Sequence, residues 1–239
     1  MSVNEQTERA RLDAIASDSW YAKGANAATI RYAAKVFNRY WRPGRCLELG
    51  PAEGLMTELL SATFPDLTLV DGSEQFCADL RRRFPNANVQ CALFEDFEPD
   101  RQFDTIVLSH VLEHVAFPRA LLESVRTWLT PRGSVYAAVP NARSIHRQAA
   151  VLMETLPTEH SLNETDHHHG HRRVYGPEGF RNEFLAAGLK IRVFGGYWLK
   201  PLSNAQIDAS WTPDMLDAFM QLGERYPDIA AEIYVVATP

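Results

Sequence analysis

The sequence predicts an α/β fold, a doubly wound parallel sheet with helices on both faces. Three observations predict it. Short apolar runs alternate with helical segments between residues 45 and 139, a spacing typical of βαβ units. A small-residue turn containing Gly50 follows the first run. Asp71 closes the second run, about 20 residues later, where nucleotide-binding sheets carry an acidic residue.

Length and composition limit the class of protein. The chain has 239 residues, 46% of them hydrophobic and 23% charged, which suits a single globular domain. Its net charge of −6 disfavours nucleic acid and anionic membranes as partners. The three cysteines, Cys46, Cys77 and Cys91, form no close pair, so we expect neither a disulfide framework nor a cysteine zinc site.

The chain also lacks the usual signals for export or membrane insertion. Residues 1–20 carry both signs of charge and contain no apolar run, unlike a signal peptide. No segment reaches the roughly 18 apolar residues of a membrane span. We therefore expect a cytoplasmic protein.

The elements are expected in a regular order. Residues 5–40 read as helical because Ile30, Ala33, Ala34 and Phe37 recur at helical spacing, and Pro43-Gly44 ends this region. The alternation that follows predicts strands at 45–49, 67–71, 88–92, 103–109 and 134–139, with helices at 54–64, 73–84 and 118–129.

The regular pattern stops after Pro140. Residues 141–175 are polar and rich in histidine, and we expect an irregular lid over the carboxyl edge of the sheet. The prediction resumes with helices at 176–188 and 213–223 and strands at 190–194 and 233–237. We thus divide the single domain 1–239 into a helical cap (1–42), a cofactor-binding core (43–140), a lid or substrate insertion (141–175) and a C-terminal part of the sheet (176–239).

The first turn and the second strand indicate a nucleoside cofactor without phosphate. Gly50 lets the backbone approach a ligand closely, and Asp71 can accept hydrogen bonds from ribose hydroxyls. Gly50 and Gly54 fit Gly-x-Gly-x-x-Gly poorly, and Glu48 would repel a pyrophosphate but attract an ammonium group. This favours S-adenosylmethionine over a dinucleotide. An ordinary strand-to-helix turn, and a helix cap at Asp71, are the structural alternatives.

Four motifs together resemble a known family. They are Leu47–Gly54, Val70–Ser73, Phe103–Val115 and Leu129–Gly133. The chain resembles the class I S-adenosylmethionine-dependent methyltransferases of the small-molecule type. The resemblance implies a Rossmann-like seven-stranded sheet of order 3-2-1-4-5-7-6 whose last strand is antiparallel.

The resemblance also assigns cofactor contacts. It implies that ten residues surround the methionine part, the ribose, the adenine and the transferred methyl group of the cofactor. These residues are Glu48, Gly50, Pro51, Gly54, Asp71, Gly72, Leu93, Phe94, Ser109 and His110. The family often bonds the adenine amino group with an Asp, but Leu93 stands at that position. Backbone groups of Leu93 and Phe94, or the side chains of Glu95 or Asp96, are the alternatives.

Two groups of histidines invite a metal interpretation that we do not adopt. The string His110–His114 matches His-x-x-Glu-His, but that zinc pattern needs a helix and His110 follows a strand. The second group, His167–His171, could bind a metal, form a solvated lid, or contact the substrate. Adjacent residues rarely point at one ion, so we predict no metal site.

The expected reaction is methyl transfer from S-adenosylmethionine, with S-adenosylhomocysteine as product, to an oxygen or nitrogen of a small acceptor. The base candidates are His110 first, then His146 and His171. Asn141, Arg143, Arg172 and Tyr175 are expected to bind the acceptor, and the arginines suit an acidic group on it. Trp20, Tyr21 and Asn26 are candidates to cap the cofactor. A protein target, a non-catalytic cofactor-binding or partner-interaction protein, and an NAD-dependent oxidoreductase are the alternatives.

Overall fold

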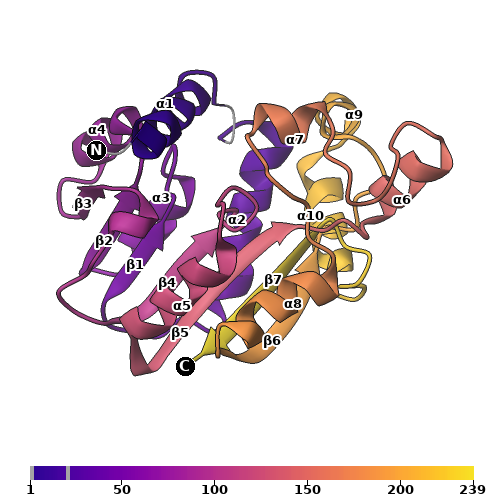
Figure 1. Ribbon diagram of the computed structural model, residues 1–239. Helices are drawn as coiled ribbons and strands as arrows, with labels where there is room; N and C mark the ends of the chain where they lie inside the picture. The colour runs from indigo at the N-terminus through magenta and orange to yellow at the C-terminus, as the bar shows by residue number, and fades with distance from the viewer. Residues whose placement is uncertain (1–2, 20–21) are drawn as a thin grey trace.

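The computed structural model describes residues 3–19 and 22–239, and in them a single twisted sheet forms the centre of the fold (Figure 1). Its order is β3-β2-β1-β4-β5-β7-β6. The strands are β1 (Cys46–Leu49), β2 (Leu67–Asp71), β3 (Asn88–Cys91), β4 (Phe103–Ser109), β5 (Leu129–Pro140), β6 (Lys190–Tyr197) and β7 (Glu232–Thr238). Strand β7 runs antiparallel to both of its neighbours, β5 and β6, and opposite in direction to the other six strands. The predicted sheet order and the antiparallel last strand are confirmed.

Helices cover both faces of the sheet. They are α1 (Val3–Ser17), α2 (Gly24–Asn38), α3 (Leu55–Ser61), α4 (Glu74–Arg83), α5 (Pro118–Trp128), α6 (Ile145–Leu152), α7 (Glu164–His168), α8 (Pro177–Ala186), α9 (Asn204–Ser210) and α10 (Pro213–Gly223). One core joins α5 and α8 to the sheet, and a second joins α2, α3 and α10 to the opposite face. Alternation within β4 supplies both cores, since Ile106 and Leu108 face the first and Val107 the second.

Two predicted boundaries were wrong. The helical region predicted at 5–40 is two helices, and α2 begins at Gly24, whose φ is +51°. Strand β5 begins at Leu129, five residues before the predicted start, because Leu129 pairs with Phe103 across an irregular register. The Pro131-Arg132-Gly133 stretch reads as a turn in the sequence but lies within the strand.

The segment 141–175 is more ordered than its sequence predicts. It contains α6 and α7, and α7 begins with a capping box between Asn163 and Asp166. Buried Arg147 donates to the carbonyl of Glu159 at 2.8 Å. The five residues of α7 are all polar, and the eight residues of α6, several of them apolar, are too few to show a helical period. Together with α1, α7 lies across the edge of the sheet at which the parallel strands end (Figure 1). That this segment acts as a lid stays a prediction.

Two further elements have no counterpart in the sequence prediction, the short 3-10 helix η1 (Phe94–Asp96) and the helix α9. Strand β6 is also three residues longer than predicted, and these residues pair with the start of β7. Among the described residues, no helix is long and apolar enough to cross a membrane.

Candidate active site

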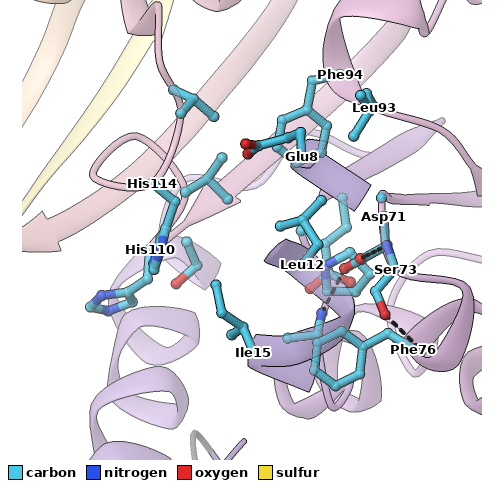
Figure 2. A pocket seen from close by; sticks show the side chains of 18 of the residues that line it. Glu8, Leu12, Ile15, Asp71, Ser73, Phe76, Leu93, Phe94, His110 and His114 are labelled. Carbon is cyan, nitrogen blue, oxygen red and sulfur yellow. Dashed lines mark hydrogen bonds between the residues drawn. The ribbon is translucent and has the colours of Figure 1, made fainter. Parts of the chain in front are cut away.

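A cavity of about 480 Å³ opens where β1, β2 and β4 end. The chain crosses from one side of the sheet to the other between β1 and β4, and ligands of open α/β sheets bind at this switch point. Figure 2 shows Asp71 and Ser73 at one side of the cavity and His110 and His114 at the other. Residues of α1 close it from above. The cavity therefore has one side built by β1 and β2 and another built by β4.

The turn after β1 brings backbone close to the cavity. Gly50 has φ +67°, and its N–H donates to the carbonyl of Val70 at 2.9 Å. A Cβ at Gly50 would lie 3.0 Å from a methyl of Val111, so a larger residue would narrow the cavity. Gly54, with φ +76°, precedes α3 and does not line the cavity. Its role in this structure is to form the turn.

Asp71 presents its carboxylate to the cavity from the end of β2. Oδ1 accepts from the N–H of Ser73 at 2.9 Å, and Oδ2 accepts from the N–H of Ala52 at 3.2 Å. Burial raises the pKa of Asp71 to about 6, against these backbone bonds. The cap of α4 is Ser73, whose hydroxyl accepts from the N–H of Phe76. Each carboxylate oxygen can accept a second hydrogen bond, so Asp71 is able to bind a pair of hydroxyls.

Glu48 is a second buried carboxylate in the cavity wall. The hydroxyl of Thr57 donates to its Oε2 at 2.6 Å. Burial raises the pKa of Glu48 to about 8, and the charge of Asp71 adds to the shift. No ion pair found among the described residues includes Glu48. A buried acid without a cation suits a ligand that brings an ammonium group.

The rest of this side is apolar. Leu93 and Phe94 line it beside Gly72, and Figure 2 shows the first two side chains above Asp71. A Cβ at Gly72 would lie 2.5 Å from a methyl of Leu12 and 3.0 Å from one of Leu93. The space over Gly72 is thus filled by apolar side chains, a surface of the kind that packs against a flat aromatic base. Glu95 and Asp96 also line the cavity. With the two carboxylates, the residues on this side fit S-adenosylmethionine.

The β4 side of the cavity is polar and buried. His110, which follows β4, has φ +56°, and its side chain is 15% exposed. Its Nδ1 lies 3.3 Å from Oε1 of Glu113, and its Nε2 lies 3.9 Å from Oε2 of Glu232. Burial lowers the pKa of His110, but the close approach of the Glu113 carboxylate and the charges of Glu232 and Glu113 outweigh it and raise the pKa above its ordinary value.

Several buried polar atoms on this side have no hydrogen-bond partner among the described residues. They are Ser109 Oγ, His110 Nε2, both carboxylate oxygens of Glu113, and Glu232 Oε2. Burial raises the pKa of Glu232 to about 7, against the charges of His110 and Lys200. Buried polar groups are normally paired. Of these residues, Ser109 and His110 line the cavity, so these two are placed to pair with a ligand or water there.

The two other predicted bases lie behind the cavity wall. The Nδ1 of His171 lies 3.0 Å from Oδ1 of Asp166. Burial lowers the pKa of His146 to about 2, and the charges of Lys200 and Arg147 add to the shift, so this imidazole is neutral. Neither His171 nor His146 lines the cavity.

Of the predicted acceptor-binding residues, the structure brings only Arg172 to the cavity. Its guanidinium donates to Oε2 of Glu8 at 2.9 Å. Three others have structural bonds elsewhere. Asn141 donates to the carbonyls of Asp228 and Ala230, Arg143 pairs with Glu178 at 2.7 Å, and the buried Tyr175 hydroxyl donates to the carbonyl of Leu112 at 3.4 Å.

The predicted cofactor-capping residues do not enter the site as expected. Trp20 and Tyr21 lie outside the described residues, and Asn26 accepts from Asn204 at 2.7 Å, away from the cavity. Sequence reasoning missed α1 instead. Its cavity-lining residues are Glu8, Arg11, Leu12 and Ile15. The spacing of Leu12 and Ile15 is the one weak signal that could have identified this face.

Comparison with known proteins settles the family. The family model described as a methyltransferase domain matches residues 22–192. The chain is 26% identical over 168 residues to a ubiquinone biosynthesis O-methyltransferase of Sinorhizobium medicae, covering 67% of this chain and 65% of that protein. It is 23% identical over 168 residues to a trans-aconitate 2-methyltransferase of Yersinia pestis, covering 69% and 64%. The matches span slightly less than two thirds of these relatives.

Solved structures agree with this assignment at the level of the fold. The N-methyltransferase NodS of Bradyrhizobium japonicum, bound to S-adenosyl-L-homocysteine, superimposes with a TM-score of 0.62 at 14% identity, covering 98% of this chain and 97% of NodS. The DhpI complex with SAM and HEP gives 0.60 at 19%, covering 99% and 97%. The chain belongs to the methyltransferase-domain family, within the class I S-adenosylmethionine-dependent methyltransferases, and this prediction is confirmed.

Proposed function

We propose that this protein transfers a methyl group from S-adenosylmethionine to an oxygen or nitrogen atom of a small-molecule acceptor. The observation that carries the proposal is the two-sided cavity. Two buried carboxylates and apolar side chains line one side, and Ser109 and His110, each with a buried polar atom that has no hydrogen-bond partner among the described residues, line the other. The relatives named for ubiquinone biosynthesis and for trans-aconitate support a small-molecule acceptor for this chain as well.

The β1–β2 side would hold the cofactor, which supplies the methyl group and its sulfonium leaving group when bound. Glu48 would accept from the ammonium, and Asp71 would accept from both ribose hydroxyls. Gly72, Leu93 and Phe94 would enclose the adenine. None of these residues takes part in bond making. Their contribution is orientation and exclusion of water, which methyl transfer mainly requires.

The β4 side would hold the acceptor. We assign His110 as the base that removes a proton from the attacking oxygen or nitrogen, because Glu113 contacts Nδ1 and leaves Nε2 for the acceptor. A base positioned in this way contributes about 10²–10⁴-fold to rate. An acidic acceptor would have to displace Glu8 from Arg172 and Arg11, which both bond it. Glu113 and Glu232, which lie beside His110 and do not themselves line the cavity, favour a polar, uncharged part of the acceptor near His110.

Calorimetric titration with S-adenosylmethionine, S-adenosylhomocysteine and NAD tests the cofactor part. We expect micromolar binding of the first two alone, and its loss in Asp71→Ala. The matched control is Asp100→Ala, because the Asp100 side chain is 91% exposed and far from the cavity lining. Binding of NAD instead would overturn the proposal. Cofactor binding without turnover across a broad acceptor screen would support a non-catalytic binding protein.

A further inference from the structure

The fold joins the two histidine groups that are separate in the sequence. Glu113 and His114 lie in the loop after β4, and His171 follows α7 more than fifty residues later. One ligand atom from each of these three residues lies within 4.8 Å of the others. The rings of His114 and His171 meet edge to face, with their centroids 4.8 Å apart. In the zinc-peptidase pattern a helix brings the ligands together. Here the side chains of Glu113, His114 and His171 are brought together by two loops.

The Glu113 carboxylate is the unusual member of this cluster. Its side chain is fully buried, and neither oxygen has a hydrogen-bond partner among the described residues. The nearest cationic candidate is His110, whose Nδ1 lies 3.3 Å from Oε1. A buried carboxylate is costly unless it is paired, hydrogen-bonded or bound to a metal. Glu113 has two oxygens, so it can contact His110 with one and an ion with the other.

The orientation of His171 is fixed from behind. Its Nδ1 lies 3.0 Å from Oδ1 of Asp166, which leaves Nε2 to serve as a ligand. Asp166 is itself held, because Arg147 donates to its Oδ2 at 3.1 Å and the N–H of Asn163 donates to the same oxygen at 3.0 Å. A carboxylate behind a histidine is the usual arrangement around protein-bound zinc, where it fixes the ring and its tautomer.

We propose that Glu113, His114 and His171 form a binding site for a divalent transition-metal ion, with zinc as the ion that best fits two imidazoles and one carboxylate. Three protein ligands leave a coordination position open. His114 lines the cavity, so an ion bound to it would lie next to the cavity wall. Given the proposed function, the ion would bind an oxygen of the acceptor and hold it beside the cofactor. This last step rests on the methyltransferase activity, whereas metal binding itself does not.

Cobalt(II) is the probe that tests the site. The full chain is treated with a chelator, dialysed, and titrated with Co²⁺ while visible absorption is recorded. We expect one Co²⁺ per chain with micromolar or tighter affinity, ligand-field bands typical of four or five ligands, and displacement by Zn²⁺. Glu113→Gln and His171→Ala should each lose at least about 100-fold in Co²⁺ affinity. Asp166→Asn should lose about 10–100-fold, as expected for a residue that orients a ligand.

The matched control is His167→Ala. His167 is exposed, belongs to the same histidine-rich segment, and lies outside the cluster, so this variant should bind Co²⁺ like the natural protein. S-adenosylmethionine binding by calorimetry verifies that each variant is folded. The site is refuted if the natural protein binds no stoichiometric Co²⁺, or if Glu113→Gln and His171→Ala bind it as tightly as His167→Ala does. Co²⁺ binding without S-adenosylmethionine binding would keep the metal site and reject the proposed function.

Discussion

The two sides of the cavity are built in different ways. The β1–β2 side takes its two buried carboxylates, Glu48 and Asp71, from two strands that follow one another along the chain. The β4 side combines His110 and Glu113 after β4 with Glu232 at the start of β7, from distant parts of the chain. The first side carries carboxylates that are hydrogen-bonded, and the second carries buried polar atoms without partners. A side built from one local unit suits a fixed ligand, whereas an assembled side can suit a variable one.

The largest effect should come from His110→Ala on the β4 side. Loss of the proposed base should lower kcat by about 10²–10⁴-fold, with a much smaller change in the Kd for S-adenosylmethionine. Single-turnover assays with a saturating acceptor, once it is found, measure this. If the affinity for S-adenosylmethionine fell as much as kcat, His110 would contribute to cofactor binding, and the assignment of the two sides to different ligands would be wrong.

On the β1–β2 side, Glu48→Gln should weaken S-adenosylmethionine binding by about 10–100-fold, because a hydrogen bond to a charged group is worth about 1.5–3 kcal/mol. The change keeps the side-chain volume and the contact with Thr57. Calorimetry measures the Kd, with Glu123→Gln on the exposed face of α5 as the control. An unchanged Kd would remove Glu48 from the ammonium site.

The pH dependence of cofactor binding sharpens the same assignment. Burial raises the pKa of Glu48 to about 8, so in the ligand-free protein this group is protonated below that pH and ionised above it. An ammonium ligand needs the carboxylate. Affinity should therefore fall as pH drops from 8 towards 6, by at most about tenfold per pH unit. Titrations at pH 6, 7 and 8 measure it, and Glu48→Gln should flatten the profile.

The smallest expected effect concerns the helix above the cavity. The hydroxyl of Ser73 donates to Oδ1 of Asp13 at 2.8 Å, which ties α1 to the start of α4. Asp13→Ala should lower the free energy of unfolding by about 0.5–1.5 kcal/mol. It should also raise the Kd for the cofactor by about 2–10-fold. Stopped-flow release of S-adenosylhomocysteine should show that most of the change is in the dissociation rate. A Kd equal to that of the natural protein would mean that α1 does not retain the cofactor.

Three residues of the β1–β2 side could be located from the sequence because their signals are local, although the cofactor contacts assigned to them stay predictions. Glu48, Gly50 and Asp71 lie at strand ends that apolar runs identify, and all three line the cavity. The order of the sheet required more than the pattern of elements. It came from the resemblance carried by four motifs, since alternation alone does not say which strands are neighbours.

The β4 side was only partly accessible from the sequence. His110 was found because it follows a strand, but Glu232 lies 122 positions away from it, and no local pattern links the two. Asn141 was expected at the acceptor because it follows β5, yet its amide bonds two backbone carbonyls. A polar residue after a strand has two uses, as a ligand or as a support for the loop, and the choice depends on tertiary contacts.

The direction of β7 has a consequence for how such an enzyme can diversify. Because β7 runs against β5 and β6, it starts, at Glu232, on the edge where β6 ends at Tyr197. Both ends of the connecting segment 198–231 therefore lie at the edge of the sheet where Glu232 approaches His110. If the β4 side holds the acceptor, as proposed, insertions or exchanges within this connection would change acceptor recognition and leave the strands and the proposed cofactor contacts in place.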